Sequence, residues 1–407
     1  MQSTLRESPE TQPMAKPIEP VVAVVGSPVG DGVRFGAWVS KPFGDGNRLE
    51  SGYEVETHGE VKRGVLWFQS PTHVLKPSGE ALLAAGFFPA LSRGVPLSLN
   101  EPVSGRTLDH IHRLAEVFGC WLDLPRELTV HARRSASLPS APRRSLCCFS
   151  AGVDSFYSSL HGLEPQAALL FISGFDIAVD NRALLETVLA GIRDAAQSMN
   201  RELVLVETNA RSVVEGLGVH WSFSHFTALA AVGFLLGGDF DQLRVPSSHH
   251  YREIFPWGSS PLTDPWWSSE AMEFVHHGSA LTRVEKVEYI ANHPVAMKHL
   301  RVCWSNRKGA YNCGRCEKCI RTMVSLRAVG ALDRCTTFPL PLDLKVVARL
   351  IIEDEDTLKL VRENHDFVRR RGTDPALERA LRYCRDQRFN RGLLRWMRKV
   401  WAWWRYT

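Results

Sequence analysis

From residue 146 onward, short apolar runs alternate with runs whose apolar residues have helical spacing. This alternation narrows the choice of folds sharply, because strands separated by helices usually pair in parallel and need helices on both faces of their sheet. We therefore expect an α/β fold with an open, mostly parallel sheet and flanking helices. The predicted strands are "SLCCFS", "AALLFISGF" and "ELVLVETN", and the predicted helices are "DSFYSSLHGL", "NRALLETVLAGIRDAAQSM" and "SHFTALAAVGFLL".

The first third of the chain has a different pattern. Residues 20–70 hold short apolar runs separated by Gly, Pro and Asp, which is typical of strands and turns. Two helix-like stretches follow, and a Pro- and Ser-rich segment, 133–145, then separates this part from the alternating part. We expect a polar, disordered leader over 1–19, a β-rich α+β domain over 20–138, an α/β domain over 139–338 and a helical region over 339–407.

Charge, hydrophobicity and cysteine content indicate which partners and which cellular location to expect. The net charge of +5 is small for 407 residues and does not by itself indicate a nucleic-acid partner. No apolar run is long enough to span a membrane, and the N-terminus lacks the apolar segment of a secretory signal. Four of the nine cysteines fall within residues 303–319, which favours metal ligation over disulfides. We expect a cytoplasmic protein.

The segment "FSAGVDSF", residues 149–156, joins a predicted strand to a predicted helix. Ligands of open α/β sheets bind at such places, where free N–H groups of the helix N-terminus attract phosphate. Ser150, Gly152 and Ser155 are small enough to close around phosphate oxygens, and Asp154 would orient the loop or help to hold Mg²⁺. The alternative is an ordinary small-residue turn.

The cysteines have the spacing C-x9-C-x2-C-x2-C, formed by Cys303, Cys313, Cys316 and Cys319. Four thiolates suit a tetrahedral zinc ion, and the C-x2-C spacing lets two sulfurs meet around a tight turn. All four coordination positions would be filled, so the metal would be structural. An iron–sulfur cluster is the alternative for this spacing.

The loop and the cysteines together resemble a known family. "FSAGVDSF" is similar to the SGGxDS loop of the PP-loop ATP pyrophosphatases, and the cysteine quartet about 150 residues later resembles 7-cyano-7-deazaguanine synthase. "SALTRVEKVEYIA" is similar to that family's helix ahead of the zinc module. The resemblance covers roughly residues 146–335. Ala151 departs from it, because the family has glycine there.

The resemblance implies a Rossmann-like PP-loop fold and an activity. Such enzymes cleave ATP, with Mg²⁺, to AMP and pyrophosphate, and the adenylate of a carbonyl or carboxylate is then attacked by ammonia or another nucleophile. It assigns zinc to the four cysteines and nucleotide binding to Gly174 and Phe175. The catalytic candidates are Asp154 and Ser155 of the loop, with Lys286 beyond it. Lys286 and Arg283 would pair with the charge of the leaving pyrophosphate, or would be ordinary exposed cations of a helix. The loop residues expected to contact ATP are Ser150, Ala151, Gly152, Val153, Asp154 and Ser155.

Two further segments are candidates for binding. Thr208 and Asn209 end a predicted strand and would touch ribose or phosphate, or would only cap the next helix. The irregular segment 247–270 is rich in aromatic residues, which is typical of a lid over a small-molecule substrate. A structural lid whose tryptophans pack on the sheet is the alternative.

The last residues, 388–407, combine six Arg or Lys with four Trp. A basic aromatic helix of this kind lies on the inner face of a membrane or docks on a partner protein, whereas nucleic acid is not favoured. The alternative is a helix that packs on its own domain. Two other functions stay open: a nucleotide sensor or scaffold without turnover, for which Ala151 is a sign, and a tRNA-modifying enzyme, which would need a reactive cysteine.

Overall fold

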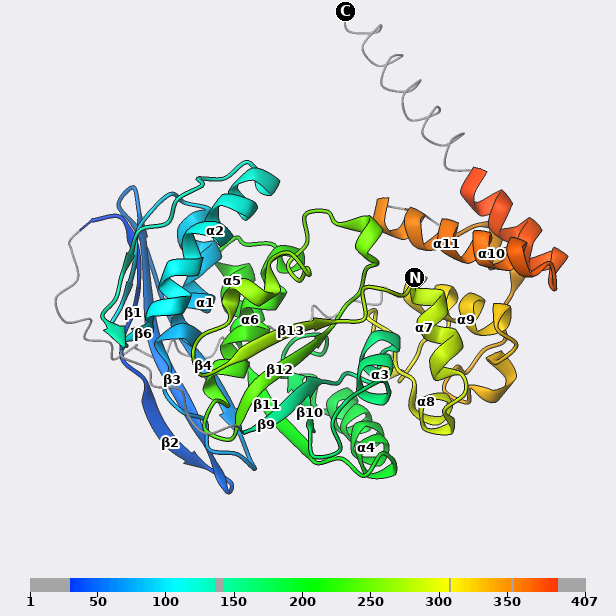
Figure 1. Cartoon of the computed structure of the whole chain (residues 1–407), viewed down its shortest axis with the longest axis horizontal. Coiled ribbons are helices and arrows are strands. Elements are labelled where there is room, and N and C mark those ends of the chain that lie inside the picture. The colour runs from blue at the N-terminus through cyan, green and yellow to red at the C-terminus, as the bar shows by residue number, and fades with distance from the viewer. Residues whose placement is uncertain (1–29, 136–142, 307–308, 351, 353–354, 387–407) are drawn as a thin grey trace, which may run out of the picture.

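The computed structural model describes residues 30–135, 143–306, 309–350, 352 and 355–386. The predicted leader and the predicted basic aromatic tail lie outside these residues. The α/β class is confirmed, because helices flank one large mixed sheet of 11 strands (Figure 1).

The strands of the alternating part are parallel, as expected. Their order across the sheet is β13-β12-β9-β10-β11, and each neighbouring pair is parallel. Their carboxyl ends therefore meet at one edge of the sheet, which is where ligands of α/β proteins bind. The strands are β9 (Arg144–Cys148), β10 (Ala168–Ser173), β11 (Leu203–Thr208), β12 (Phe240–Pro246) and β13 (Glu273–His277).

The strands of the N-terminal part extend the same sheet. β4 lies antiparallel beside β11, and the order continues β4-β3-β1-β5-β7, with β2 paired to β3. The predicted domain boundary near residue 139 is therefore no break in the sheet, and the antiparallel N-terminal strands make the sheet as a whole mixed. These strands are β1 (Gly32–Phe35), β2 (Val39–Phe43), β3 (Gly46–Thr57), β4 (Glu60–Ser70), β5 (Leu97–Leu99) and β7 (Val130–His131), and the separate pair is β6 (Val103–Ser104) and β8 (Arg134–Ser135).

Helices cover both faces of the sheet (Figure 1). One face packs against α1 (Gly79–Leu91), α2 (Gly105–Leu122), α5 (Ala210–Gly216) and α6 (Trp221–Leu235). The other packs against α3 (Val153–Leu160), α4 (Arg182–Ser198), α7 (Arg283–Ile290) and α8 (Pro294–His299). α1 and α6 are apolar on nearly all sides, which is why they lie buried against each other between the sheet and the outer layer.

The C-terminal helices form a third, smaller core on α7. It is built by α7, α9 (Glu317–Ala328), α11 (Glu355–Arg371) and the helical residues 375–386, with α10 (Leu344–Ala348) at its side. Glu363 of α11 accepts a hydrogen bond of 2.8 Å from the backbone N–H of Val284, at the start of α7. Among the described helices, none is long and apolar enough to cross a membrane.

The two halves of the sheet meet at a short seam. Only two residue pairs join β11 to β4, Glu207 with Gln69 and Thr208 with Phe68. The Asn209 side chain lengthens this contact, because its amide donates to the carbonyl of Val65 at 2.8 Å and accepts from the N–H of Trp67 at 2.9 Å. A side chain thus replaces the next backbone pair of the ladder.

We expect Asn209→Ala to lower the free energy of unfolding by about 2 kcal/mol, because two backbone groups of β4 lose their partner. Urea denaturation measures the change. Glu215→Ala, one turn into α5, removes an exposed ion pair with Arg211 and should cost no more than about 0.5 kcal/mol. Equal effects of the two variants would contradict the role of Asn209 at the seam.

Candidate functional site

The loop between β9 and α3 has a strained backbone. Ala151 is fully buried and has a φ of +56°, a region that side-chain-bearing residues enter at a cost of about 1–2 kcal/mol. Glycine would adopt this conformation freely, so the departure from the SGGxDS pattern falls at the position where it costs most. Strain of this kind persists where the surrounding contacts determine the backbone, and it is common at binding sites.

Hydrogen bonds hold the loop in this shape. The carbonyl of Ala151 accepts from the backbone N–H of Arg301 at 2.8 Å. The hydroxyl of Ser155 donates to the carbonyl of Gly152 at 3.1 Å and accepts from the N–H of Ser150 at 3.3 Å. Ser155, predicted to be catalytic, is buried and braces the loop from within.

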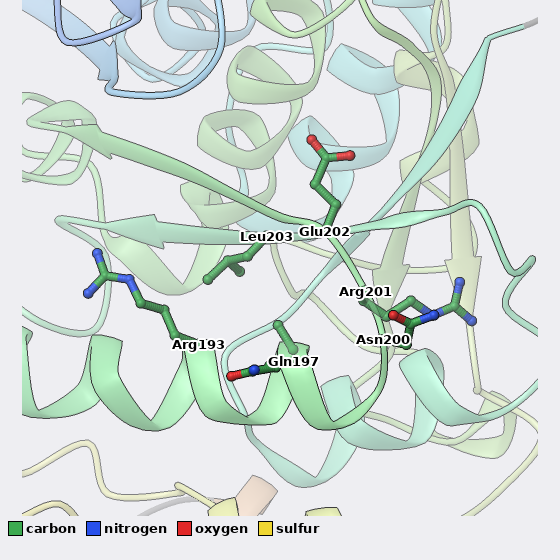
Figure 2. A pocket seen from close by; sticks show the side chains of 7 residues that line it. Arg193, Gln197, Asn200, Arg201, Glu202 and Leu203 are labelled. Carbon is green, nitrogen blue, oxygen red and sulfur yellow. The ribbon is translucent and has the colours of Figure 1, made fainter.

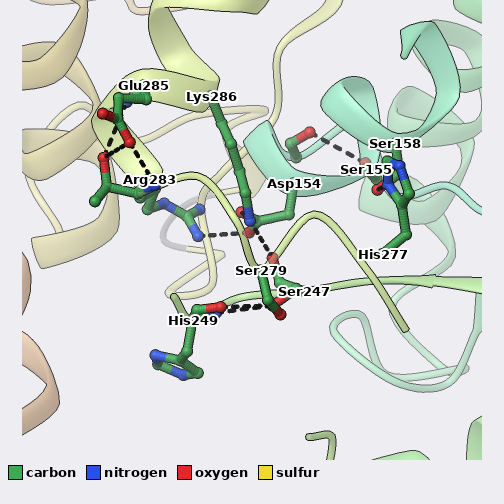
Figure 3. A network of polar contacts seen from close by, with 12 residues as sticks. Asp154, Ser155, Ser158, Ser247, His249, His277, Ser279, Arg283, Glu285 and Lys286 are labelled. Atoms are coloured by element: carbon green, nitrogen blue, oxygen red, sulfur yellow. Dashed lines mark hydrogen bonds and ion pairs between the residues drawn. The ribbon is translucent and has the colours of Figure 1, made fainter. Parts of the chain in front are cut away.

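Asp154, in the first turn of α3, binds two cations from α7 (Figure 3). Its carboxylate lies 2.5 Å from Nη1 of Arg283 and 3.4 Å from Nζ of Lys286. Lys286 is only 1% exposed, and its ammonium also donates to the carbonyl of Ser247 at 2.6 Å. The structure therefore brings together two predicted catalytic residues, Asp154 and Lys286, at the start of the helix that follows the loop.

The local sequence explains why α7 presents both cations to Asp154. Thr282 and Glu285 form a capping box, in which each side chain accepts from the backbone N–H of the other residue. The helix therefore begins at Arg283, and Arg283 and Lys286 lie three positions apart, on the same face.

The charges around Asp154 shift its acidity and that of its neighbours. Burial raises the pKa of Asp154, but the Arg283 and Lys286 cations outweigh burial and hold that pKa below its usual value. Burial lowers the pKa of Lys286, against the pull of Asp154. Burial also lowers the pKa of His249 to about 3, so this imidazole is neutral beside the pair.

Part of the predicted aromatic lid lines the same edge of the sheet. Half-buried rings contact one another in a chain that runs from Phe175 through Trp221, His225, Trp257 and His249 to Phe255. Trp267 differs, because it is 1% exposed and packs edge-on to Phe87 in the core. The lid is thus divided: residues around η1 (Tyr251–Glu253) border the edge, and η2 (Asp264–Trp267) anchors the segment.

The remaining residues predicted to bind nucleotide lie either at the carboxyl edge of the parallel strands or at the seam between β11 and β4. Gly174 directly follows β10 and has a φ of +98°, and a Cβ there would lie 2.0 Å from the carbonyl of Thr208, so only glycine fits. Phe175 next to it lies at the carboxyl edge of the parallel strands. Thr208 is fully buried and donates to Trp67, and Asn209 is held by β4, so the side chains of these two residues serve the seam rather than the edge.

The four predicted metal ligands converge. The sulfurs of Cys303, Cys313, Cys316 and Cys319 all lie within 4.8 Å of one another, in a buried group that could hold a metal ion such as zinc. The sulfurs of Cys313 and Cys319 are 3.9 Å apart, as are those of Cys303 and Cys316. No other group of this kind occurs among the described residues.

Asn312 and Gly314 shape the backbone around Cys303, Cys313 and Cys316. The Asn312 side chain accepts from the N–H groups of Val302 and Cys303 and donates to the carbonyl of Leu300 at 2.8 Å, which ties the first ligand to the second. Gly314 has a φ of +66°, and the N–H of Cys316 points at the sulfur of Cys313 at 3.2 Å. Asn312 was not a sequence candidate, although its place beside Cys313 could have suggested a role.

Two surface pockets lie at the opposite edge of the sheet from this site. One, of about 490 Å³, is lined by the end of α4 and the start of β11 (Figure 2). Arg201 in it is already bound to the carbonyls of Leu163 and Pro165. The other, of about 380 Å³, adjoins the starts of β9, β12 and β13. Neither contains a residue of the loop or of the cysteine group.

We expect Asp154→Asn to lower the free energy of unfolding by about 3 kcal/mol, because it leaves Lys286 buried without its counter-charge. Adding Lys286→Met should restore at least about 1 kcal/mol, since the unpaired charge is then gone. Urea denaturation compares the variants, with Asp180→Asn, an exposed carboxylate, as the control. A double variant that is less stable than Asp154→Asn would contradict this account.

We expect the purified protein to contain about one metal ion per chain, and Cys316→Ser to lose it and to unfold at a lower temperature. Elemental analysis and thermal unfolding measure both effects. Cys335→Ser is the matched control, because Cys335 is buried nearby but lies outside the quartet. Metal retained by Cys316→Ser, or lost by Cys335→Ser, would refute the assignment of these four ligands.

Comparison of the chain with protein-family models, with curated proteins and with solved structures found no match. The function is therefore argued from the geometry described above. That geometry combines a strained loop before α3, two cations held over the start of this helix, and a buried four-cysteine group whose loop contacts the same strained residue.

Proposed function

We propose that the protein is an ATP-dependent adenylating enzyme, similar in its chemistry to the PP-loop ATP pyrophosphatases. The observation that carries the proposal is the placement of Arg283 and Lys286 beside the first turn of α3, at the carboxyl edge of the parallel strands. A helix N-terminus attracts anions, and fixed cations next to it suit a polyphosphate. The loop between β9 and α3 therefore needs no basic residue of its own to bind the phosphates.

The cations would act on the leaving group. When an oxygen of the acceptor attacks the α-phosphorus of ATP, the bond to the β-phosphate breaks and pyrophosphate leaves with additional negative charge. Arg283 and Lys286 are held in place by Asp154 and Ser247 before ATP arrives, so they stabilise this charge without reorganisation. Asp154 is then a positioning residue for the cations, and Mg²⁺ that enters with ATP supplies further charge neutralisation.

The second step releases AMP. Ammonia or another nucleophile attacks the activated carbon, a C–N bond forms in the case of an amine, and the bond to the phosphate oxygen breaks so that AMP leaves. The proton of the amine passes to solvent or to a nearby base. Phe175, Trp221 and Trp257 are half-buried at this edge, where aromatic side chains would pack against a small-molecule acceptor.

We propose zinc as the ion of the four-cysteine group. Tetrahedral coordination with Zn–S bonds of about 2.3 Å places sulfurs about 3.8 Å apart. The two spacings of 3.9 Å agree with this value. An iron–sulfur cluster spreads its ligands over several iron atoms, so its cysteine sulfurs would be farther apart. Four protein ligands leave no open position, which supports a structural role.

A thiolating, tRNA-modifying function has less support. Cys147 and Cys148 lie just before the loop, but burial raises the pKa of Cys147 to about 12 and raises the pKa of Cys148 well above its usual value. Neither thiol is therefore activated as a nucleophile. A nucleotide-binding scaffold would bind ATP without consuming it, so analysis of the products of labelled ATP distinguishes it from the enzyme.

We expect AMP and pyrophosphate, rather than ADP and phosphate, when the protein is incubated with labelled ATP, Mg²⁺ and a metabolite extract. Lys286→Met should reduce the rate at least about 100-fold, because a buried charge at the leaving group is lost. Lys298→Met, which removes an exposed cation on α8, serves as the control. Chromatography of the labelled products gives the rates.

The products decide the proposal. ADP and phosphate would refute the adenylating mechanism. ATP that binds but is not consumed, with any extract, would favour the scaffold. Equal rates for the wild type and Lys286→Met would remove Lys286 from the mechanism while leaving the reaction type in place.

A further inference from the structure

Arg301 is a buried cation that has no counter-charge in the part of the chain that the structure describes. It is 5% exposed, and no carboxylate of the described residues forms an ion pair with its guanidinium. Its Nη2 donates to Oδ1 of Asn306 at 2.8 Å, whereas its Nε is buried and has no partner in the described part of the chain. Burial of a charge with an unmade hydrogen bond is costly, so it points to an anion that completes the site.

The other buried or half-buried cations near the loop are already paired. Arg283 and Lys286 share the carboxylate of Asp154. Arg321 of α9 is paired with Glu317. Arg301 differs from all three, because its side-chain partner among the described residues is a neutral amide. Its capacity to bind an anion is therefore still available.

The position of Arg301 links it to two loops at the carboxyl edge of the sheet. Its backbone N–H donates to the carbonyl of Ala151, in the strained loop after β9. Its partner Asn306 donates in turn to the carbonyl of Asp176, in the loop after β10, at 2.9 Å. Adjacent parallel strands frame ligands between their carboxyl ends, so Arg301 stands where a ligand of this edge would lie.

We propose that Arg301 binds a pyrophosphate group, either as the β- and γ-phosphates of ATP or as free pyrophosphate. The inference rests on the proposed function, and it adds a binding residue that lies two positions before Cys303 rather than on α3 or α7. A guanidinium offers several N–H groups in a planar fork, which matches phosphate oxygens.

The experiment measures binding by titration calorimetry with three probes: pyrophosphate, Mg-ATP and AMP. The variants are Arg301→Gln, which retains a donor for Asn306, and Lys298→Gln, an exposed control with the same loss of charge. We expect Arg301→Gln to weaken binding of pyrophosphate and Mg-ATP about 10- to 100-fold, to leave AMP binding unchanged, and to keep its metal. Lys298→Gln should match the wild type.

Thermal unfolding without ligand separates a binding role from a structural one. If Arg301 awaits an anion, Arg301→Gln should be at least as stable as the wild type when no anion is added, and pyrophosphate should stabilise it less. A variant that loses stability and metal but binds pyrophosphate like the wild type would overturn the inference.

The outcomes also distinguish the inference from the proposed function. Wild-type binding of Mg-ATP that Arg301→Gln leaves unchanged would refute the role of Arg301 and retain the adenylating function. Binding of pyrophosphate that depends on Arg301, without binding of Mg-ATP, would retain the anion site and refute the function. A wild type that binds none of the three probes would refute both.

Discussion

A lysine withdrawn from water must be paired, and Lys286 satisfies this need by joining three parts of the chain. Its ammonium contacts Asp154 on α3 and the carbonyl of Ser247 after β12, while its own helix, α7, is capped by Glu363 of α11. One charge therefore holds α3 and the start of the segment after β12 to α7, and Glu363 holds α11 to the same helix. The arrangement of the candidate site follows from it.

Local pattern predicted much of the fold. The alternation after residue 146 indicated β9, β10, β11 and the helices between them, because apolar runs of strand length and helical spacing are properties of neighbouring residues. The union of both halves in one sheet could not be predicted in this way. It depends on the pairing of β4 with β11, which are far apart in sequence, and on an Asn209 side chain that looks like an ordinary helix cap.

The residues of the candidate site also divide into those that local sequence predicts and those that only the folded chain reveals. Asp154, Lys286 and the four cysteines stood out because residue type and spacing alone carry their chemistry. Arg301 has no such signal: what sets it apart is its burial and the lack of a carboxylate partner among the described residues, and both are properties of the folded chain. The use of the Thr208 hydroxyl at the seam likewise has no signal in the sequence, since it depends on the neighbouring strand β4.

The seam between β11 and β4 also has a mechanical meaning. A protein whose parts rest on separate sheets can close around its ligand by hinge bending, but one continuous sheet transmits force through its backbone hydrogen bonds and resists such bending. The 11-stranded sheet is therefore a rigid part of the molecule. Access to the carboxyl edge then depends on the parts outside the sheet, namely the aromatic segment around η1 and the C-terminal helices of the third core.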